Sequence, residues 1–149
     1  LRAFEIAIAE QPQHLQPWTL MCAYNKVNGY YTSEHPFLLK QVLRREWNYS
    51  GLTMTDWGAV HERWRGIAQG MDLEMPGSHG AHDAMTLERI LSGENDNNNN
   101  DPSSSLSKAA LDECVLRVLT LILWGTELQA TPSPTPQYKQ VVLQRNHET

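Results

Sequence analysis

The chain has 149 residues, a usual size for one domain, and its 40% hydrophobic content is ordinary for a protein with a packed core. Its formal net charge of -5 argues against a nucleic acid as partner, because phosphate binding needs a basic face, and no block of Lys or Arg suggests attraction to a membrane. The only two cysteines, Cys22 and Cys114, form no disulfide framework and no zinc-ligand set. We interpret both as small buried residues rather than as a disulfide pair.

The first part of the chain predicts a helix, a strand and a loop. Arg2 to Glu10 has helical spacing, and Pro12 and Pro17 end the pattern. Trp18 to Tyr24 is a short, nearly continuous apolar run, which is typical of a strand buried on both faces. The polar stretch from Asn25 to Gly29 is predicted to be a loop.

A second helix and a second strand follow. The helix is predicted from Pro36 to Trp47, with Ser33 as a cap just upstream, since Pro suits the first helical turn. Asn48 to Gly51 is predicted to be a turn. Leu52 to Thr55 then forms a short strand that ends at Asp56.

A third unit repeats this alternation. Helical spacing returns from Ala59 to Gln69, Met71 to Met75 has the pattern of a strand, and a further helix is predicted from Ala81 to Leu91. The alternation indicates the α/β class with parallel strands. Three such units are too few to close a barrel and would leave sheet edges open, so the pattern fits the C-terminal part of a (β/α)8 TIM-like barrel, incomplete in this chain.

The last third contains one more predicted helix. Gly93 to Ser105 is low in complexity and is predicted to be a disordered surface insertion. Ser107 is predicted to cap a helix from Lys108 to Trp124, with Gly125 at its C-terminus. This predicted helix is the most apolar part of the chain, but charged residues interrupt it, which favours a packed helix over a membrane span.

These patterns give a domain division. Residues 1–125 are interpreted as a C-terminal portion of a barrel domain with its insertion at 93–105. Residues 126–149, with the stiff Thr131–Pro136 segment, are interpreted as an interdomain linker and the start of a further segment.

The chemistry is expected at the carboxyl ends of the strands, where βα barrels build their sites. Asp56 is expensive to desolvate there without a partner or a function. It could attack an anomeric carbon and give a covalent glycosyl intermediate, or it could cap the helix predicted to follow it. Trp57 offers an apolar face for a sugar ring or packs in the core. Tyr24 has a hydroxyl that could bond Asp56 or a ligand, or it is an ordinary half-buried tyrosine.

Four linked segments resemble glycoside hydrolase family 3. They are Met-Cys-Ala-Tyr-Asn-Lys-Val-Asn-Gly at 21–29, a Leu-Leu…Leu-Arg-x-Glu-Trp helix at 38–47, Thr-Asp-Trp-Gly-Ala at 55–59 and Asp-Leu-Glu-Met-Pro-Gly at 72–77. The match is close from residue 21 to 77 and looser from 108 to 125. Ala23 and Thr55 replace the serines that are usual in the family, and both are small.

The resemblance implies a retaining β-glucosidase, which hydrolyses terminal non-reducing β-D-glucosyl residues in carbohydrate catabolism. Asp56 then matches the catalytic nucleophile, Met21 and Tyr24 match residues that line the sugar subsite, and Trp57 matches the tryptophan beside the nucleophile. The expected partner is a β-glucoside or cello-oligosaccharide, and no metal or other cofactor is implied. A β-xylosidase or N-acetylglucosaminidase of the same family, or a truncated non-catalytic fragment, are the alternatives.

The resemblance also indicates what the chain lacks. It places the sugar-binding Lys-His pair and an early Asp before Leu1, and the general acid after Thr149, so the isolated chain is expected to be inactive. His79 matches no catalytic position of the family and is not expected to replace the acid. Asp72 and Glu74 are expected to be structural partners at the third strand.

Overall fold

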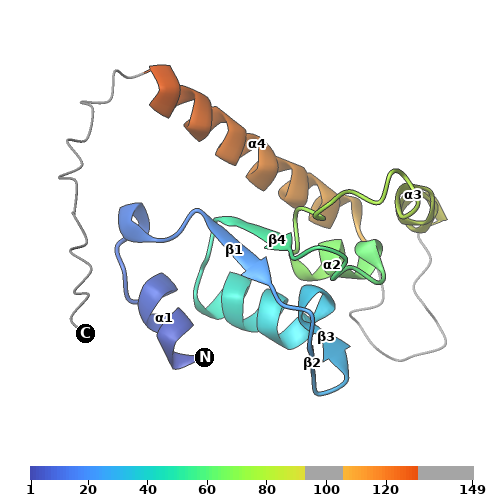
Figure 1. Cartoon of the computed structure of the whole chain (residues 1–149), viewed down its shortest axis with the longest axis horizontal. Coiled ribbons are helices and arrows are strands. Elements are labelled where there is room, and N and C mark those ends of the chain that lie inside the picture. The colour runs from blue at the N-terminus through green and yellow to red at the C-terminus, as the bar shows by residue number, and fades with distance from the viewer. Residues whose placement is uncertain (93–105, 131–149) are drawn as a thin grey trace, which may run out of the picture.

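The computed structural model describes residues 1–92 and 106–130 (Figure 1). The predicted insertion at 93–105 and the predicted linker after residue 130 lie outside the described residues. The described chain mixes short strands with helices, as the α/β prediction requires. Its elements are α1 (Arg2–Ile8), η1 (Gln13–Leu15), β1 (Thr19–Cys22), β2 (Lys26–Val27), β3 (Tyr30–Tyr31), η2 (Thr32–Glu34), η3 (Pro36–Glu46), β4 (Leu52–Thr55), α2 (Arg63–Gln69), α3 (Asp83–Ser92) and α4 (Lys108–Ala130).

The central sheet consists of β1 and β4, which pair in parallel from Thr19↔Leu52 to Cys22↔Thr55. The predicted strand at Met71–Met75 is reduced to one parallel bridge, Met54↔Leu73. Side chains take over part of the ladder, because the Thr53 N–H donates to an Asp72 carboxylate oxygen at 2.8 Å and the Met75 N–H donates to the Thr55 hydroxyl at 2.9 Å. The parallel direction of the strands was correctly predicted, whereas the predicted length of the third strand was wrong.

β1 is not buried on both faces, contrary to the prediction. Cys22 is buried, but its neighbour Met21 is 58% exposed. Successive side chains of a strand point to opposite faces, and the helix η3 covers only the face that carries Leu20 and Cys22. One face of this short sheet is therefore open.

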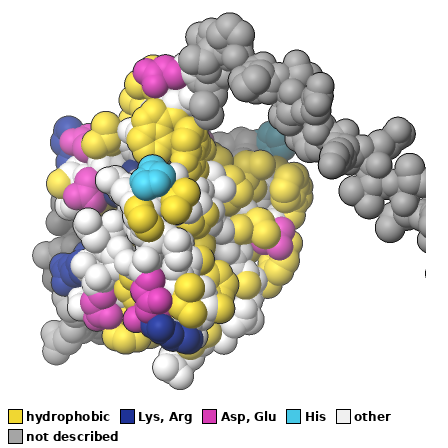
Figure 2. Space-filling view, turned by 90° about the vertical axis from the view of Figure 1, so that its left-hand side faces the viewer, with side chains coloured by type: hydrophobic (Ala, Val, Ile, Leu, Met, Phe, Trp, Pro, Cys, Tyr) yellow, Lys and Arg dark blue, Asp and Glu magenta, His cyan; other side chains and the backbone are white. Residues whose placement is uncertain are grey.

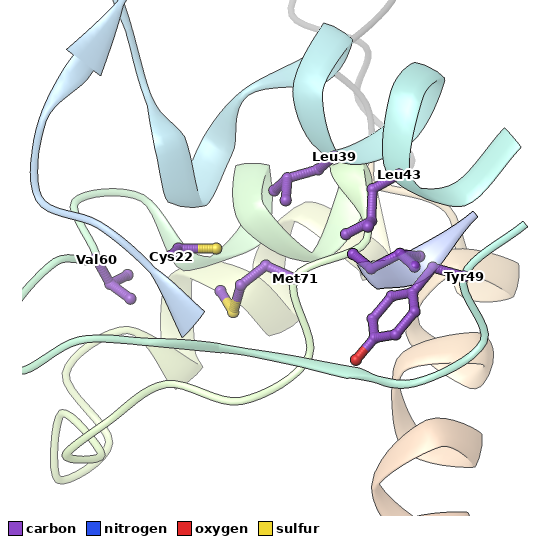
Figure 3. Packing of buried hydrophobic residues seen from close by; sticks show 7 residues of the cluster. Cys22, Leu39, Leu43, Tyr49, Val60 and Met71 are labelled. Carbon is purple, nitrogen blue, oxygen red and sulfur yellow. The ribbon is translucent and has the colours of Figure 1, made fainter. Parts of the chain in front are cut away.

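Two apolar clusters stabilise the described chain. The first joins the covered face of the sheet to α1, η3 and the loop after β4 (Figure 3). The second joins α2 to the beginning of α4. Both cysteines are free and buried, one in each cluster, which agrees with their interpretation as small core residues. The buried members are Ile8, Cys22, Leu39, Leu43, Tyr49, Val60 and Met71 in the first cluster, and Trp64, Ile67, Ala68, Leu106 and Cys114 in the second.

The stretch after β1 is a small hairpin rather than a plain loop. β2 and β3 pair antiparallel through Lys26↔Tyr31 and Val27↔Tyr30. The two turn residues, Asn28 and Gly29, have positive φ values of 49° and 90°. An Asn-Gly pair is the usual signal for such a turn, so the sequence did contain the information that the loop prediction missed.

η3 begins at Pro36 as predicted, but its cap is His35. The His35 Nδ1 accepts from the Leu38 N–H at 3.3 Å, while the predicted cap, Ser33, is buried and donates to the Ala59 carbonyl at 2.8 Å. η3 is a π-helix, and its last turn closes with the Trp47 N–H donating to the Val42 carbonyl.

α2 begins at Arg63 rather than at Ala59. The buried carboxylate of Glu34 accepts from the N–H groups of His61 and Glu62 at 3.0 and 2.8 Å. These two donors are thus satisfied by a distant side chain, and the preceding residues stay non-helical. α3 begins two residues later than predicted.

α4 begins as predicted and ends later. The Ser107 hydroxyl accepts from the Ala110 N–H at 3.1 Å, so this residue caps the helix. The prediction that Gly125 ends the helix was wrong, because α4 continues through it to Ala130. A glycine inside a helix costs only about 1 kcal/mol relative to alanine, which is too little to stop a long helix. No described helix combines the length and the apolar character that crossing a membrane requires.

Candidate functional site

Asp56 lies at the carboxyl end of β4, on a backbone that is fixed on both sides. The Thr55 N–H donates to the Leu73 carbonyl at 3.0 Å, and the Asp56 N–H donates to the Cys22 carbonyl at 3.3 Å. The Thr55 side chain is fully buried, whereas the Asp56 side chain is only partly buried. The fold therefore presents one carboxylate at the edge of a rigid strand.

Helix capping does not explain Asp56. Its Oδ1 accepts from the adjacent Trp57 N–H at 2.7 Å, and α2 begins only at Arg63, with Glu62 at the cap position. The alternative that Asp56 caps the following helix is therefore wrong. The local bond fixes one carboxylate oxygen and orients the carboxylate.

Tyr24 approaches Asp56 from the neighbouring strand. It lies two residues beyond β1 and is 51% exposed. Partial desolvation, and then the hydrogen bond and negative charge of Asp56, raise the pKa of Tyr24. The phenol therefore keeps its proton and can donate it in a hydrogen bond to the carboxylate.

Two apolar side chains lie exposed near this carboxylate. Met21 is paired with Met54 in the sheet register, and Asp56 follows Met54 by two residues, so these three side chains share the face that η3 does not cover. Trp57 is 62% exposed, which rules out the alternative that it packs in the core. The structure thus brings Met21, Tyr24, Asp56 and Trp57 together at the carboxyl end of the sheet, which we call its open edge.

Asp72 is a structural partner, as predicted. Its fully buried carboxylate pairs with Arg44 Nη2 at 2.7 Å and with Arg117 Nε at 2.8 Å, and it also accepts from the Thr53 N–H. The sequence motifs did not indicate these two arginines. Arg117 is a charged residue within an otherwise apolar stretch of helix, which is a signal that could have indicated a buried partner, whereas Arg44 has the charged neighbours Arg45 and Glu46 and carries no such signal.

Glu74 is likewise a structural partner, and His79 lies in an exposed turn. The buried carboxylate of Glu74 contacts His82 Nδ1 at 3.0 Å and Arg63 Nε at 3.7 Å, which ties the 71–75 segment to α2 and to the start of α3. His79 is exposed in a turn with a φ of 52°. Over residues 1–92 and 106–130, no group of three or more His, Cys, Asp or Glu side chains is arranged to hold a metal ion.

Comparison with known proteins identifies relatives of this chain. Residues 1–76 match the glycosyl hydrolase family 3 N-terminal domain. Thermostable β-glucosidase B of Acetivibrio thermocellus is 43% identical over 112 residues, which are 75% of this chain and 13% of that protein. An exo-α-(1→6)-L-arabinopyranosidase of Bifidobacterium longum is 48% identical over 64 residues, which are 43% of this chain and 8% of that protein.

Solved structures agree with these relatives. β-Glucosidase 3B from Thermotoga neapolitana, in complex with glucose, superposes with a TM-score of 0.67 and 35% sequence identity. The superposition covers 83% of this chain and 16% of the Thermotoga chain. The chain therefore spans a small part of the proteins that it matches.

Proposed function

Since the chain belongs to glycosyl hydrolase family 3, we propose that it supplies the nucleophile edge of a retaining β-glucosidase. The observation that supports this best is the open edge of the sheet. A carboxylate on a fixed backbone faces solvent there, with a tyrosine hydroxyl beside it and two exposed apolar side chains around it. Exposed apolar side chains beside a carboxylate and a hydroxyl suit a sugar ring.

The proposed reaction forms a covalent glycosyl intermediate on Asp56. The carboxylate attacks the anomeric carbon of a terminal β-D-glucosyl residue, the glycosidic bond breaks, and water later releases the sugar with retained configuration. The Tyr24 hydroxyl orients the carboxylate, and Met21 and Trp57 line the sugar subsite. A second carboxylic acid must protonate the leaving oxygen, and we propose that it lies outside this chain.

We also propose that the described residues are the C-terminal part of a (β/α)8 barrel. The parallel pairing of β1 and β4, the bridge to Leu73 and the open apolar face of β1 support this. Since α4 is continuous through Gly125, we place the end of the barrel portion at Ala130 and the linker after it.

The test is a chimera with the Thermotoga neapolitana enzyme. Residues 1–130 of this chain replace the matching segment of that β-glucosidase, and the chimera is assayed with aryl β-glucosides and with an aryl α-L-arabinopyranoside. Asp56→Asn is expected to reduce kcat by at least about a thousandfold, because an amide is a poor nucleophile. A 2-deoxy-2-fluoroglucoside should label Asp56, as mapped by mass spectrometry.

A structural role for Asp56 predicts the opposite result. Asn is nearly isosteric with Asp and can still accept from the Trp57 N–H, so a merely structural residue would tolerate the change. An Asp56→Asn chimera with near-normal turnover, or a label on another carboxylate, would refute the proposal. Preference for the arabinopyranoside would change the substrate but not the nucleophile.

A further inference from the structure

A hollow of the described surface lies at the end of the sheet opposite to Asp56. Its volume is about 720 Å³, which lies within the range of small-molecule sites. Trp18 and Gly51 line it just before β1 and β4 begin, and Trp124 lines it from α4. Figure 2 shows the face of the molecule on this side, where hydrophobic side chains are gathered. We call this hollow the paired-tryptophan groove, lined by Gln13, His14, Gln16, Trp18, Ser50 and Trp124.

Two indole rings form the apolar wall of the groove. The ring centroids of Trp18 and Trp124 lie 4.8 Å apart, with planes inclined at 59°. The two residues are 37% and 38% exposed, so each still presents part of its ring to the groove. The Trp18 backbone is fixed, because its carbonyl accepts from the Leu52 N–H at 2.9 Å. The wall is therefore held by the sheet on one side and by α4 on the other.

Neutral polar groups form the rim. Gln13 donates to the Ser50 hydroxyl at 3.5 Å, and Gln16 donates to the Ile8 carbonyl at 2.7 Å, which orients its amide group. His14 adds an exposed imidazole. Glu127 is the only Asp, Glu, Lys or Arg among the described residues that line the groove.

We propose that the paired-tryptophan groove binds a neutral oligosaccharide, at a site separate from Asp56. The apolar C–H face of a pyranose ring packs on an exposed indole, and its hydroxyl groups bond amides, hydroxyls and imidazoles. No Lys or Arg lines the groove to hold a phosphate or carboxylate ligand. A purely apolar ligand would take these polar groups out of water without offering them new hydrogen bonds. This inference does not depend on the proposed role of Asp56.

The test uses the full 149-residue chain with cellotetraose, laminaritetraose and maltotetraose. The indole N–H signals of the five tryptophans are assigned by NMR, and each sugar is added up to about 20 mM, a range that covers weak sites. At least one sugar should shift the Trp18 and Trp124 signals in a saturable manner. Trp124→Ala should weaken that binding by about tenfold or more, because an aromatic anchor is lost.

Matched variants separate this site from the rest of the surface. Phe37→Ala removes a 56% exposed aromatic side chain from η3, and Asp56→Asn changes the opposite end of the sheet. Both should leave the affinity within about twofold, since neither side chain lines the groove. If Trp124→Ala disturbs the helix content, Gln13→Ala, at the exposed rim, replaces it as the deciding variant.

Several results would overturn the proposal. One is the absence of a saturable shift with all three sugars, and another is a set of shifts confined to Trp57. A third is an unchanged affinity in Trp124→Ala or Gln13→Ala. Shifts confined to Trp57 would leave the proposed function of the Asp56 edge intact. A loss of Asp56 reactivity in the chimera would in turn leave the groove unaffected, so the two proposals fail separately.

Discussion

At the scale of single residues, the backbone and not a set of side-chain partners determines where Asp56 lies. Its amide is bonded to β1, Thr55 before it is bonded to the 71–75 segment, and its carboxylate accepts from the next N–H along the chain. The buried carboxylate of Asp72 differs, because two arginine side chains neutralise it. The contrast between an open carboxylate and a neutralised one distinguishes the proposed nucleophile from the structural acid.

Alkaline pH is predicted to unfold the chain through three buried groups. Burial raises the pKa of Cys22 and Cys114 to about 11 and that of Tyr49 to about 12. The folded chain thus holds these protons to higher pH than the unfolded chain does. Their contribution to stability is complete below about pH 9 and is lost as the pH rises from about 9 to 12. Urea unfolding between pH 8 and pH 12 measures this loss.

Tyr49→Phe provides the comparison for the alkaline prediction. It removes the phenol that titrates last, so the fall in stability above about pH 10 should become shallower. Tyr30→Phe removes a phenol that is 39% exposed and serves as the control. Equal slopes in Tyr49→Phe and the unsubstituted chain would contradict the assignment.

At the scale of elements, α4 is tied to the sheet region through a buried ion cluster. Arg117 of α4 and Arg44 of η3 contact the two oxygens of Asp72, and both arginine side chains are largely buried. Arg44 also donates to the carbonyls of Tyr49, Gly51 and Gly70. The cluster therefore joins two helices to the backbone on either side of β4.

Arg117→Met is predicted to destabilise the chain strongly. It removes one partner of a buried carboxylate, a change that typically costs about 3–5 kcal/mol. Lys108→Met on the same helix breaks an exposed i,i+4 pair with Asp112 and should change the stability little. Urea denaturation of both variants checks the difference. Equal effects would show that Arg117 does not hold α4 in place.

Alanine substitutions at two glycines are predicted to change the stability of the chain in opposite directions. A Cβ at Gly125 meets no atom within 4 Å, and the residue lies inside α4, so Gly125→Ala should stabilise the chain by about 0.5–1 kcal/mol. A Cβ at Gly66 would lie 2.6 Å from Met71 Cε and 3.0 Å from the Ser33 carbonyl oxygen, so Gly66→Ala should destabilise it by about 1–3 kcal/mol. Thermal unfolding monitored by circular dichroism measures both. Loss of stability in Gly125→Ala would mean that the helix ends there.

At the scale of the whole molecule, the described chain is an open piece of α/β structure. Its two-stranded parallel sheet has η3 against one face, and α4 exposes much of its apolar surface. Besides Trp124, which lines the paired-tryptophan groove, the exposed apolar residues of α4 are Val115, Leu116, Leu119, Ile122 and Leu123. The chain also spans only 13% of the Acetivibrio thermocellus β-glucosidase that it resembles. These features agree with the proposal that it is one portion of a larger catalytic domain.

The chain by itself is therefore predicted to have no glucosidase activity. The proposed function assigns the nucleophile to this chain and the acid to another part of the protein, and acid–base assistance alone is typically worth about 10² to 10⁴ in rate. The assay is the release of nitrophenol from an aryl β-glucoside, with the Thermotoga neapolitana enzyme as the positive control. Turnover by the purified 149-residue chain at a rate typical of enzymes would show that this account of the site is incomplete.

The sequence by itself determined the features that depend on neighbouring residues. The strand Leu52–Thr55 with Asp56 at its end, the start of η3 at Pro36 and the Ser107 cap all follow from local patterns of apolar residues, proline and cap residues. The linked motifs also identified the family, because their order and spacing are visible in the sequence itself.

Only the tertiary structure decided the features that depend on distant contacts. The start of α2 is set by Glu34, 27 residues before His61, and the third strand is shortened because the Asp72 side chain bonds the Thr53 amide. The exposure of Met21 follows from which face η3 covers. Local propensities amount to at most about 1 kcal/mol per residue, whereas burying a carboxylate or an apolar face involves several, so long-range contacts prevail wherever the two disagree.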